Sequence, residues 1–511
     1  RSSCQHARMT SKIIRACCVS GLAVLAGTQV VAALSDSKDQ QVVLFEGWPT
    51  APAVPAGDDL VDSGISGDEL RGHVKAFSDD TLKGRPMGSD ESLVAARYAA
   101  ERLQAMGLKP GAADGTYFQR IDLYRTNFTA PSELHVVTKS GEKATLRYGA
   151  EFTFDTASAS LETEELRCVF VASAEDLPES PDPGVALVFQ TSSGQARRWL
   201  KDAGMANGAG FGMVLNPRGK SKVKEPSTKS GTGWRTANSA NGTAVARLNG
   251  DWGDRAYAGE LQSVTFVPNG TVERCYDVNV IGVLPGVGTE ESPALKDEIV
   301  MLAAHRDHIG LLKLRAGEEA PEDMIRNGAD DDASGCSVVL EVAEALASGE
   351  APARTVVVVL VTGEEVGMVG SGFWASNPTV DPSSVVCALN FEMLGRPDPL
   401  TDGPGNIWLT GYERSNLGPL LREHGIEVTP DVRPTQNFFK RSDNVSFAKV
   451  GIVSQTLSSF GGHGDYHRVS DEWDTLDYAH MEAAAALSAA AVRDLVSGSW
   501  KPEWNEGEPK F

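Results

Sequence analysis

The stretch Asn327-Gly328-Ala329-Asp330-Asp331-Asp332-Ala333-Ser334-Gly335 puts three carboxylates side by side and runs directly into an apolar helical pattern over residues 336–346. The acids therefore lie at the entrance of a helix. Taken alone, the run is explained by Asp332 or Ser334 capping the helix while the other carboxylates favour its positive end. Contiguous acids exclude a calcium loop of the EF-hand type, which needs alternating ligands and a glycine at its sixth position. A metal site of another kind is compatible with the run.

The chain from residue 276 onward alternates strand, loop and helix patterns. Continuous apolar runs, typical of strands covered on both faces, occur at 299–304, 355–361, 385–389 and 451–456. Helices are expected at 68–77, 91–106, 334–347 and 481–496. We therefore predict an α/β fold with a helix-covered, mixed and mostly parallel sheet. In such sheets, ligand sites gather at the carboxyl ends of the strands.

Residues 131–275 have a different texture, with short β-type runs separated by glycine, proline and serine. They predict a smaller, strand-rich inserted domain that divides the main domain into residues 67–130 and 276–500. Residues 34–66, which carry several prolines and scattered acids, predict an extended lead-in. Two domains also agree with the length of 511 residues, which exceeds what one ordinary hydrophobic core organises.

Side chains able to bind a metal follow the main strands. They are His305, Glu364, Glu365, Glu392 and, in a glycine-rich loop, His467. Each alone has an ordinary explanation as a hydrogen-bonded histidine or a solvated acid at a strand end. Together at one sheet edge they match zinc, which binds imidazole nitrogen and carboxylate oxygen. So many acids favour two ions bridged by a shared carboxylate.

The ordered set resembles peptidase family M28, the zinc aminopeptidases with two metal ions, over roughly residues 68–130 and 276–497. The matching stretches are 304–310, 328–335, 363–367, 390–395, 442–444 and 465–467. The resemblance implies two zinc ions, bridged by Asp330, and five metal ligands: His305, Asp330, Glu365, Glu392 and His467. It also implies that Glu364 is the general base, Asp307 orients His305, and Tyr466 donates to the oxyanion. Successive residues leave a strand on opposite sides, so Glu365 can hold a metal while Glu364 faces the water.

The sequence departs from the family pattern at two positions. Glu392 stands where aspartate is more frequent, and Asn444 stands where histidine is frequent. Two further imidazoles, His308 and His463, are interpreted as groups behind the ligands or at the rim. The insert resembles a protease-associated domain, which would restrict substrate entry and bring no catalytic residue.

Residues 1–33 have the pattern of a signal peptide, with Met9 as a sensible start, Lys12 and Arg15 as its positive region and an apolar centre at 16–25. We expect a secreted or periplasmic protein without a stable membrane span after leader removal. An uncleaved anchor is the alternative, but the apolar centre is shorter than the span of about 20 residues that a bilayer needs. In an exported protein Cys168 and Cys275 can form a disulfide, whereas Cys336 and Cys387 resemble small buried hydrophobes.

The formal net charge of -22 argues against nucleic-acid binding, because such a surface must supply cations. We expect an exported two-zinc aminopeptidase that acts on peptides or small proteins; the sequence does not define its oligomeric state. Carboxypeptidase or dipeptidase action and glutaminyl-cyclase-like activity are alternatives within the same fold. A non-catalytic, receptor-like ectodomain is the alternative from another class.

Overall fold

The structure is a computed structural model that describes residues 42–45, 48–49, 64–156, 162–205, 208–217, 225–226, 233–236, 243–314 and 317–511. The expected leader and most of the lead-in lie outside the described residues. Within the part of the chain that is described, no helix is both long and apolar enough to cross a membrane.

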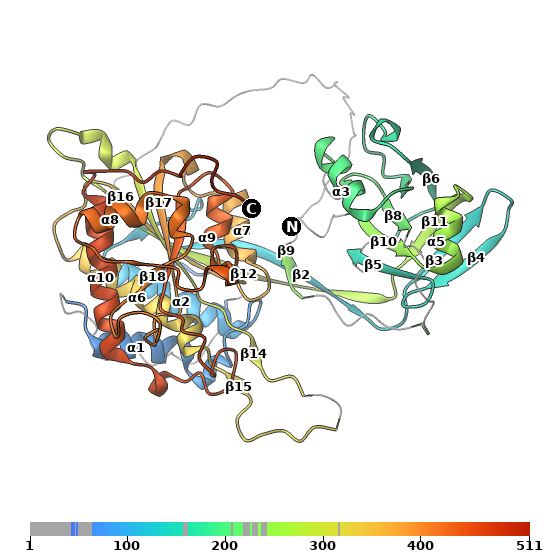
Figure 1. Cartoon of the computed structure of the whole chain (residues 1–511). Helices are drawn as coiled ribbons and strands as arrows, with labels where there is room; N and C mark the ends of the chain where they lie inside the picture. Colours follow the sequence, from blue (N-terminus) through green and yellow to red (C-terminus); the bar gives the residue numbers. More distant parts are fainter. Residues whose placement is uncertain are drawn as a thin grey trace, which may run out of the picture. The chain divides into compact units, whose positions relative to one another are not determined.

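The main sheet (Figure 1) is mixed, with four parallel strands at its centre and an antiparallel pairing on each side of them. Its strand order is β19-β18-β20-β17-β13-β16-β12-β2-β9, and β1 pairs with β12. The four central parallel strands are β16 (Thr355–Val361), β13 (Ile299–His305), β17 (Val385–Glu392) and β20 (Ser454–Ser458). The remaining strands are β1 (Lys109–Pro110), β2 (Phe118–Phe128), β9 (Arg235–Thr236), β12 (Gly270–Leu284), β18 (Trp408–Leu409) and β19 (Thr429–Pro430).

Both faces of this sheet are covered, which explains the continuous apolar runs of its central strands. Along β13, Val300, Leu302 and Ala304 pack into one core, while Met301 and Ala303 pack into another. The first core is shared with α1 (Gly67–Ser78), α2 (Asp90–Ala105), α6 (Gly335–Ala347) and α10 (Tyr478–Val496). The second is shared with α7 (Val369–Ser376) and α9 (Asn444–Ala448). The fold class is therefore α/β, as the sequence predicts.

A second sheet of eight strands is built from residues between Glu133 and Val267, in the order β4-β3-β11-β6-β7-β8-β10-β5. Its strands are β3 (Glu133–Thr138), β4 (Lys143–Arg147), β5 (Phe152–Thr156), β6 (Leu166–Val171), β7 (Val185–Phe189), β8 (Met213–Pro217), β10 (Ala244–Leu248) and β11 (Leu261–Val267). Helices α3 (Ser193–Asp202) and α5 (Gly250–Tyr257) pack with its strands in two apolar clusters that are separate from the cores of the main sheet. The protease-associated character of this segment stays a prediction.

Three details differ from the expectations. The last central strand begins at Ser454 rather than at residue 451, because Gly451 has a φ of +97° and turns the chain. Glu392 is the last residue of β17 rather than a loop residue beyond it. Cys168 and Cys275 are free, as are Cys336 and Cys387, so the possible disulfide does not form in this structure.

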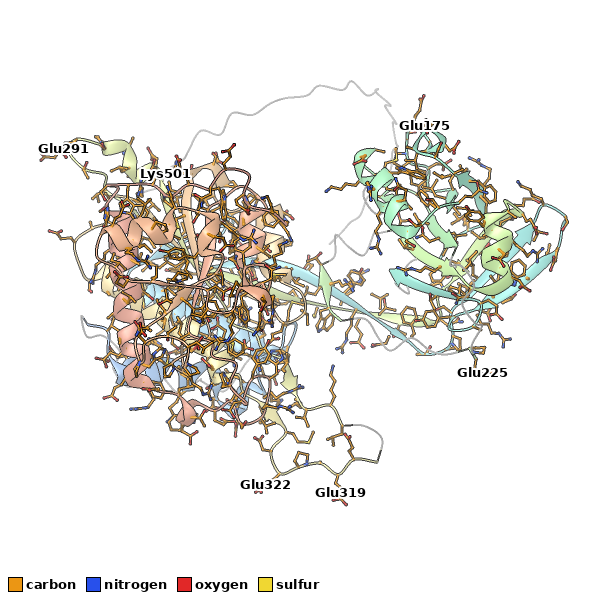
Figure 2. All side chains as sticks on the ribbon, viewed as in Figure 1. Glu175, Glu225, Glu291, Glu319, Glu322 and Lys501 are labelled. Carbon is orange, nitrogen blue, oxygen red and sulfur yellow. The ribbon has the colours of Figure 1, made fainter. Side chains whose placement is uncertain are left out.

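Acidic side chains lie at the periphery. Figure 2 shows Glu291, Glu319 and Glu322 projecting outward, and all three are exposed. Their exposure agrees with the negative net charge of the chain.

Candidate metal centre

The candidate ligands gather at the carboxyl end of the central strands because the strands that carry them are parallel. His305 ends β13 and pairs in register with Val361 at the end of β16, and the loop after β16 carries Glu364 and Glu365. Glu392 ends β17 in register with Ser458 at the end of β20. Residues from four separate parts of the chain thereby share one sheet edge.

Asp331 lies between two imidazoles. Its Oδ1 is 3.2 Å from His305 Nε2, and its Oδ2 is 3.1 Å from His467 Nε2. The same His467 nitrogen is 3.3 Å from Glu365 Oε2. Neither imidazole Nε2 has a hydrogen-bond partner within the described ranges, although both atoms are buried. Buried nitrogens facing carboxylate oxygens in this way suit a shared cation.

Asp330, which the resemblance implied as the bridging residue, lies outside this group. Its carboxylate instead accepts hydrogen bonds from Gly395 N at 2.7 Å, Arg396 Nη1 at 3.2 Å and His463 Nε2 at 2.9 Å. Asp331 takes the position between the imidazoles, and this corrects the assignment. Consecutive residues of the turn Ala329–Ser334 point in different directions, and their spacing alone does not tell which one faces the histidines.

Asp332 has a structural role that differs from those of Asp330 and Asp331. Its Oδ2 accepts the N–H of His305 at 3.2 Å, and its Oδ1 accepts those of Gly335 and Met393 at 3.0 Å each. These donors belong to the end of β13, the start of α6 and the residue that follows Glu392. The capping interpretation of the acidic run therefore holds for Asp332, which also fixes the chain on both sides of the candidate site.

His308, interpreted from the sequence as a group behind the ligands or at the rim, is fully buried inside the cluster. Its Nδ1 is 2.7 Å from Glu365 Oε1, and its ring centroid is 5.5 Å from that of His467. His308, Asp331 and Glu365 each offer a ligand atom, and these three atoms lie within 4.8 Å of one another. Its position three residues after His305 was the available signal, but that spacing did not reveal its burial.

Glu364, Glu392 and Tyr466 line a cavity of about 50 Å³ together with Asp331. Asp307 Oδ1 accepts the N–H of Glu364 at 3.1 Å, and His305 Nδ1 is 3.2 Å from the Asp307 carbonyl oxygen. The Asp307 carboxylate is farther from that nitrogen, at 3.8 Å. Asp307 therefore contacts His305 chiefly through its main chain, while its side chain holds the loop of Glu364.

The crowding of charges shifts several pKa values. Burial raises the pKa of Glu364 well above its usual range, and the nearby Glu392 carboxylate raises it further. Burial and the Asp331 charge raise the pKa of Glu392 to about 7. Burial opposes the charged form of His467, but Asp331 and Glu365 outweigh it and raise its pKa to about 9. A group of carboxylates this dense is stabilised by added positive charge, so its donor set fits zinc.

Replacing Asp332 by alanine should destabilise the metal-free protein by at least about 3 kcal/mol, because three buried N–H groups lose their acceptor. The measurement is the free energy of unfolding in denaturant with a chelator present. Asp402→Ala is the control, since Asp402 is exposed and its loss should change stability by less than about 0.5 kcal/mol. Equal stability of the two variants would contradict the role given to Asp332.

Comparisons with known proteins cover the part of the chain that holds these residues. The model of peptidase family M28 matches residues 279–492. A probable glutamate carboxypeptidase of Arabidopsis thaliana is 27% identical over 245 residues, which are 42% of this chain and 31% of that protein. A probable zinc metalloprotease of Leptosphaeria maculans is 28% identical over 200 residues, 37% of this chain and 44% of that protein. The chain thus spans less than half the length of these relatives.

Solved structures are similar at lower identity. An aminopeptidase from Aneurinibacillus sp. strain AM-1 is 18% identical with a TM-score of 0.44, and the match covers 84% of this chain and 93% of that one. A zinc aminopeptidase from Bacillus subtilis is 17% identical with a TM-score of 0.43, covering 85% and 96%. The segment 279–492 contains every candidate ligand described above, so these residues lie in the part of the chain that matches peptidase family M28.

Proposed function

We propose that this protein is a two-zinc aminopeptidase that removes N-terminal residues from peptides. The observation that carries the proposal is the position of Asp331, whose two carboxylate oxygens face one imidazole each. A carboxylate so placed is suited to bridge two ions. His305 and Glu392 would hold one ion, and His467 and Glu365 the other. When bound, zinc would polarise the scissile carbonyl and lower the pKa of a water molecule to about 7.

We call the five candidate ligands His305, Asp331, Glu365, Glu392 and His467 the cup. Side chains next to the cup would supply the proton transfers. Glu364 lines the same cavity as Asp331 and Glu392, so its carboxylate is placed to take a proton from water and to give it to the leaving amine. Tyr466 lies over His467, with ring centroids 3.8 Å apart, and burial raises its pKa. The hydroxyl therefore keeps its proton and can donate to the oxyanion.

Action at an amino terminus is the activity that the resemblance to family M28 implies, and it enters the proposal on that ground. Export rests on the leader pattern at residues 1–33, and control of substrate entry by the insert rests on its resemblance to protease-associated domains.

Glu364→Gln should lower kcat on aminoacyl-anilides by about a hundredfold or more, because the amide cannot accept the proton. Zinc content, measured by mass spectrometry of the purified protein, should stay at the wild-type value. N-acetylated versions of the same substrates should resist the wild-type enzyme, and a chelator should stop turnover. Unchanged turnover by the Glu364→Gln variant would refute the proposal.

Asp331→Asn and Asp330→Asn form a matched pair of variants that differ by one residue. The first should lose zinc, with its affinity lowered at least about tenfold, because the bridging charge is removed. The second should retain zinc, since Asp330 contacts Arg396 and His463 rather than the imidazoles of the cup. Equilibrium titration with zinc tests both variants. Loss of zinc by Asp330→Asn alone would show that Asp330, and not Asp331, is the bridging residue.

Zinc binding should release protons at pH 7. The pKa of His467 is raised to about 9 in the metal-free protein, so its imidazole is protonated at pH 7 and must become neutral to bind zinc. Above about pH 9 the imidazole is already neutral and this contribution should disappear. Calorimetric titrations in buffers of different ionisation enthalpy measure the release. Binding heats that do not depend on the buffer at pH 7 would contradict the expectation.

A further inference from the structure

The cavity lined by Asp331, Glu364 and Glu392 also has aromatic walls, and we call it the aromatic chamber. Beyond Glu364 and Glu392, its walls include Trp408, Phe438 and Phe460. The ring centroids of Trp408 and Phe438 are 5.3 Å apart, and those of Phe438 and Phe460 are 6.0 Å apart. At about 50 Å³ the cavity has room for about four water-sized groups, at roughly 10–15 Å³ each. It therefore suits a short side chain.

One cation, Arg441, also lines this chamber. Its guanidinium lies 4.8 Å from the centroid of Phe438, and its Nη1 is 3.5 Å from Gln436 Oε1. Across the described ranges, no carboxylate lies within 4.0 Å of it. By contrast, Arg396 and Arg414, two arginines of the same domain, each contact a carboxylate at 3.0 Å or less. Arg441 thus offers an unpaired positive charge to whatever occupies the chamber.

A second donor in the same wall lacks an acceptor. Trp408 is 2% exposed, and its buried Nε1–H has no hydrogen-bond partner in the described part of the chain. A buried donor without an acceptor is unfavourable, and a ligand oxygen would remove that cost. Arg441 is exposed, so water can solvate its guanidinium, whereas the Trp408 N–H is buried. Both groups line the same cavity and can donate to acceptor atoms of a ligand, which an aliphatic side chain does not have.

We propose that this chamber binds the carboxylate side chain of an N-terminal glutamate or aspartate. The methylene groups would pack on Phe438 and Phe460, and the carboxylate would pair with Arg441. The acidic side chain would then lie against Arg441, and the main chain of the terminal residue would lie toward Glu364 and Glu392. The assignment rests on the proposed aminopeptidase activity and names its substrate class.

The test compares kcat/KM for glutamyl- and leucyl-anilides in the wild-type enzyme and in the Arg441→Met variant. The wild type should prefer the glutamyl substrate. Arg441→Met should lower the ratio of glutamyl to leucyl kcat/KM by about ten- to hundredfold, the range expected for a charged hydrogen bond. Lys440→Met is the matched control: Lys440 is the adjacent cation and does not line the cavity, so the ratio should not change.

A binding measurement separates this proposal from the activity itself. Calorimetry with free glutamate and free leucine on the zinc-loaded protein should show that Arg441→Met weakens glutamate binding about tenfold or more. A protein that binds glutamate through Arg441 but cleaves no anilide would sink the aminopeptidase proposal and leave the subsite standing. A wild-type preference for leucine, with a ratio insensitive to Arg441→Met, would overturn the subsite.

The guanidinium of Arg441 could also bind a different carboxylate, namely the C-terminal carboxylate of a short peptide. N-acetylated dipeptides with a free or an amidated C-terminus form the discriminating arm. If wild-type protein cleaves the free acids and Arg441→Met abolishes only that cleavage, Arg441 reads a C-terminus and the acidic side-chain assignment is overturned. Failure to cleave either form, together with the glutamyl preference, supports it.

Discussion

The carboxylate of Asp332 holds together the chain segments that present the candidate ligands. It accepts main-chain N–H groups from His305, Gly335 and Met393, each at 3.0–3.2 Å. In a buried site every such N–H would be costly without an acceptor, so these bonds fix the ends of β13 and β17 against the start of α6. The edge that carries the site is therefore held by main-chain contacts that need no metal.

Because the main chain is fixed, the acidic side chains cannot spread apart to relieve their repulsion. Burial and neighbouring charge raise the pKa of Glu392 to about 7 and that of Glu364 well above its usual range. In metal-free protein some of these groups keep their protons, and cations would replace those protons on binding. Charge crowding is thus a physical reason for this group of side chains to bind cations.

The sequence predicts the parts of this arrangement that depend on periodicity. The central strands and the flanking helices follow from apolar runs and helical spacing, and parallel strands bring His305, Glu365 and Glu392 to one edge. Side-chain direction within an irregular turn has no such signal, so the run Asp330–Asp332 could not be resolved from spacing alone. The burial of His308 was likewise hidden, because it depends on Glu365, which is distant in sequence and packs against it.

The carboxylates of Asp330, Asp331 and Asp332 make different contacts, and these contacts explain why the three residues must be consecutive. Asp471 accepts the N–H groups of Asp330 and Asp331 at 3.1–3.2 Å, and Arg396 joins Asp471 to Asp330. These hydrogen bonds and ion pairs fix the main chain before Asp331, while the contacts of Asp332 fix the main chain after it. The carboxylate of Asp331 is left facing the imidazoles. Inserting one residue anywhere in the run would keep all three charges but would separate the bridging group from one of its supports.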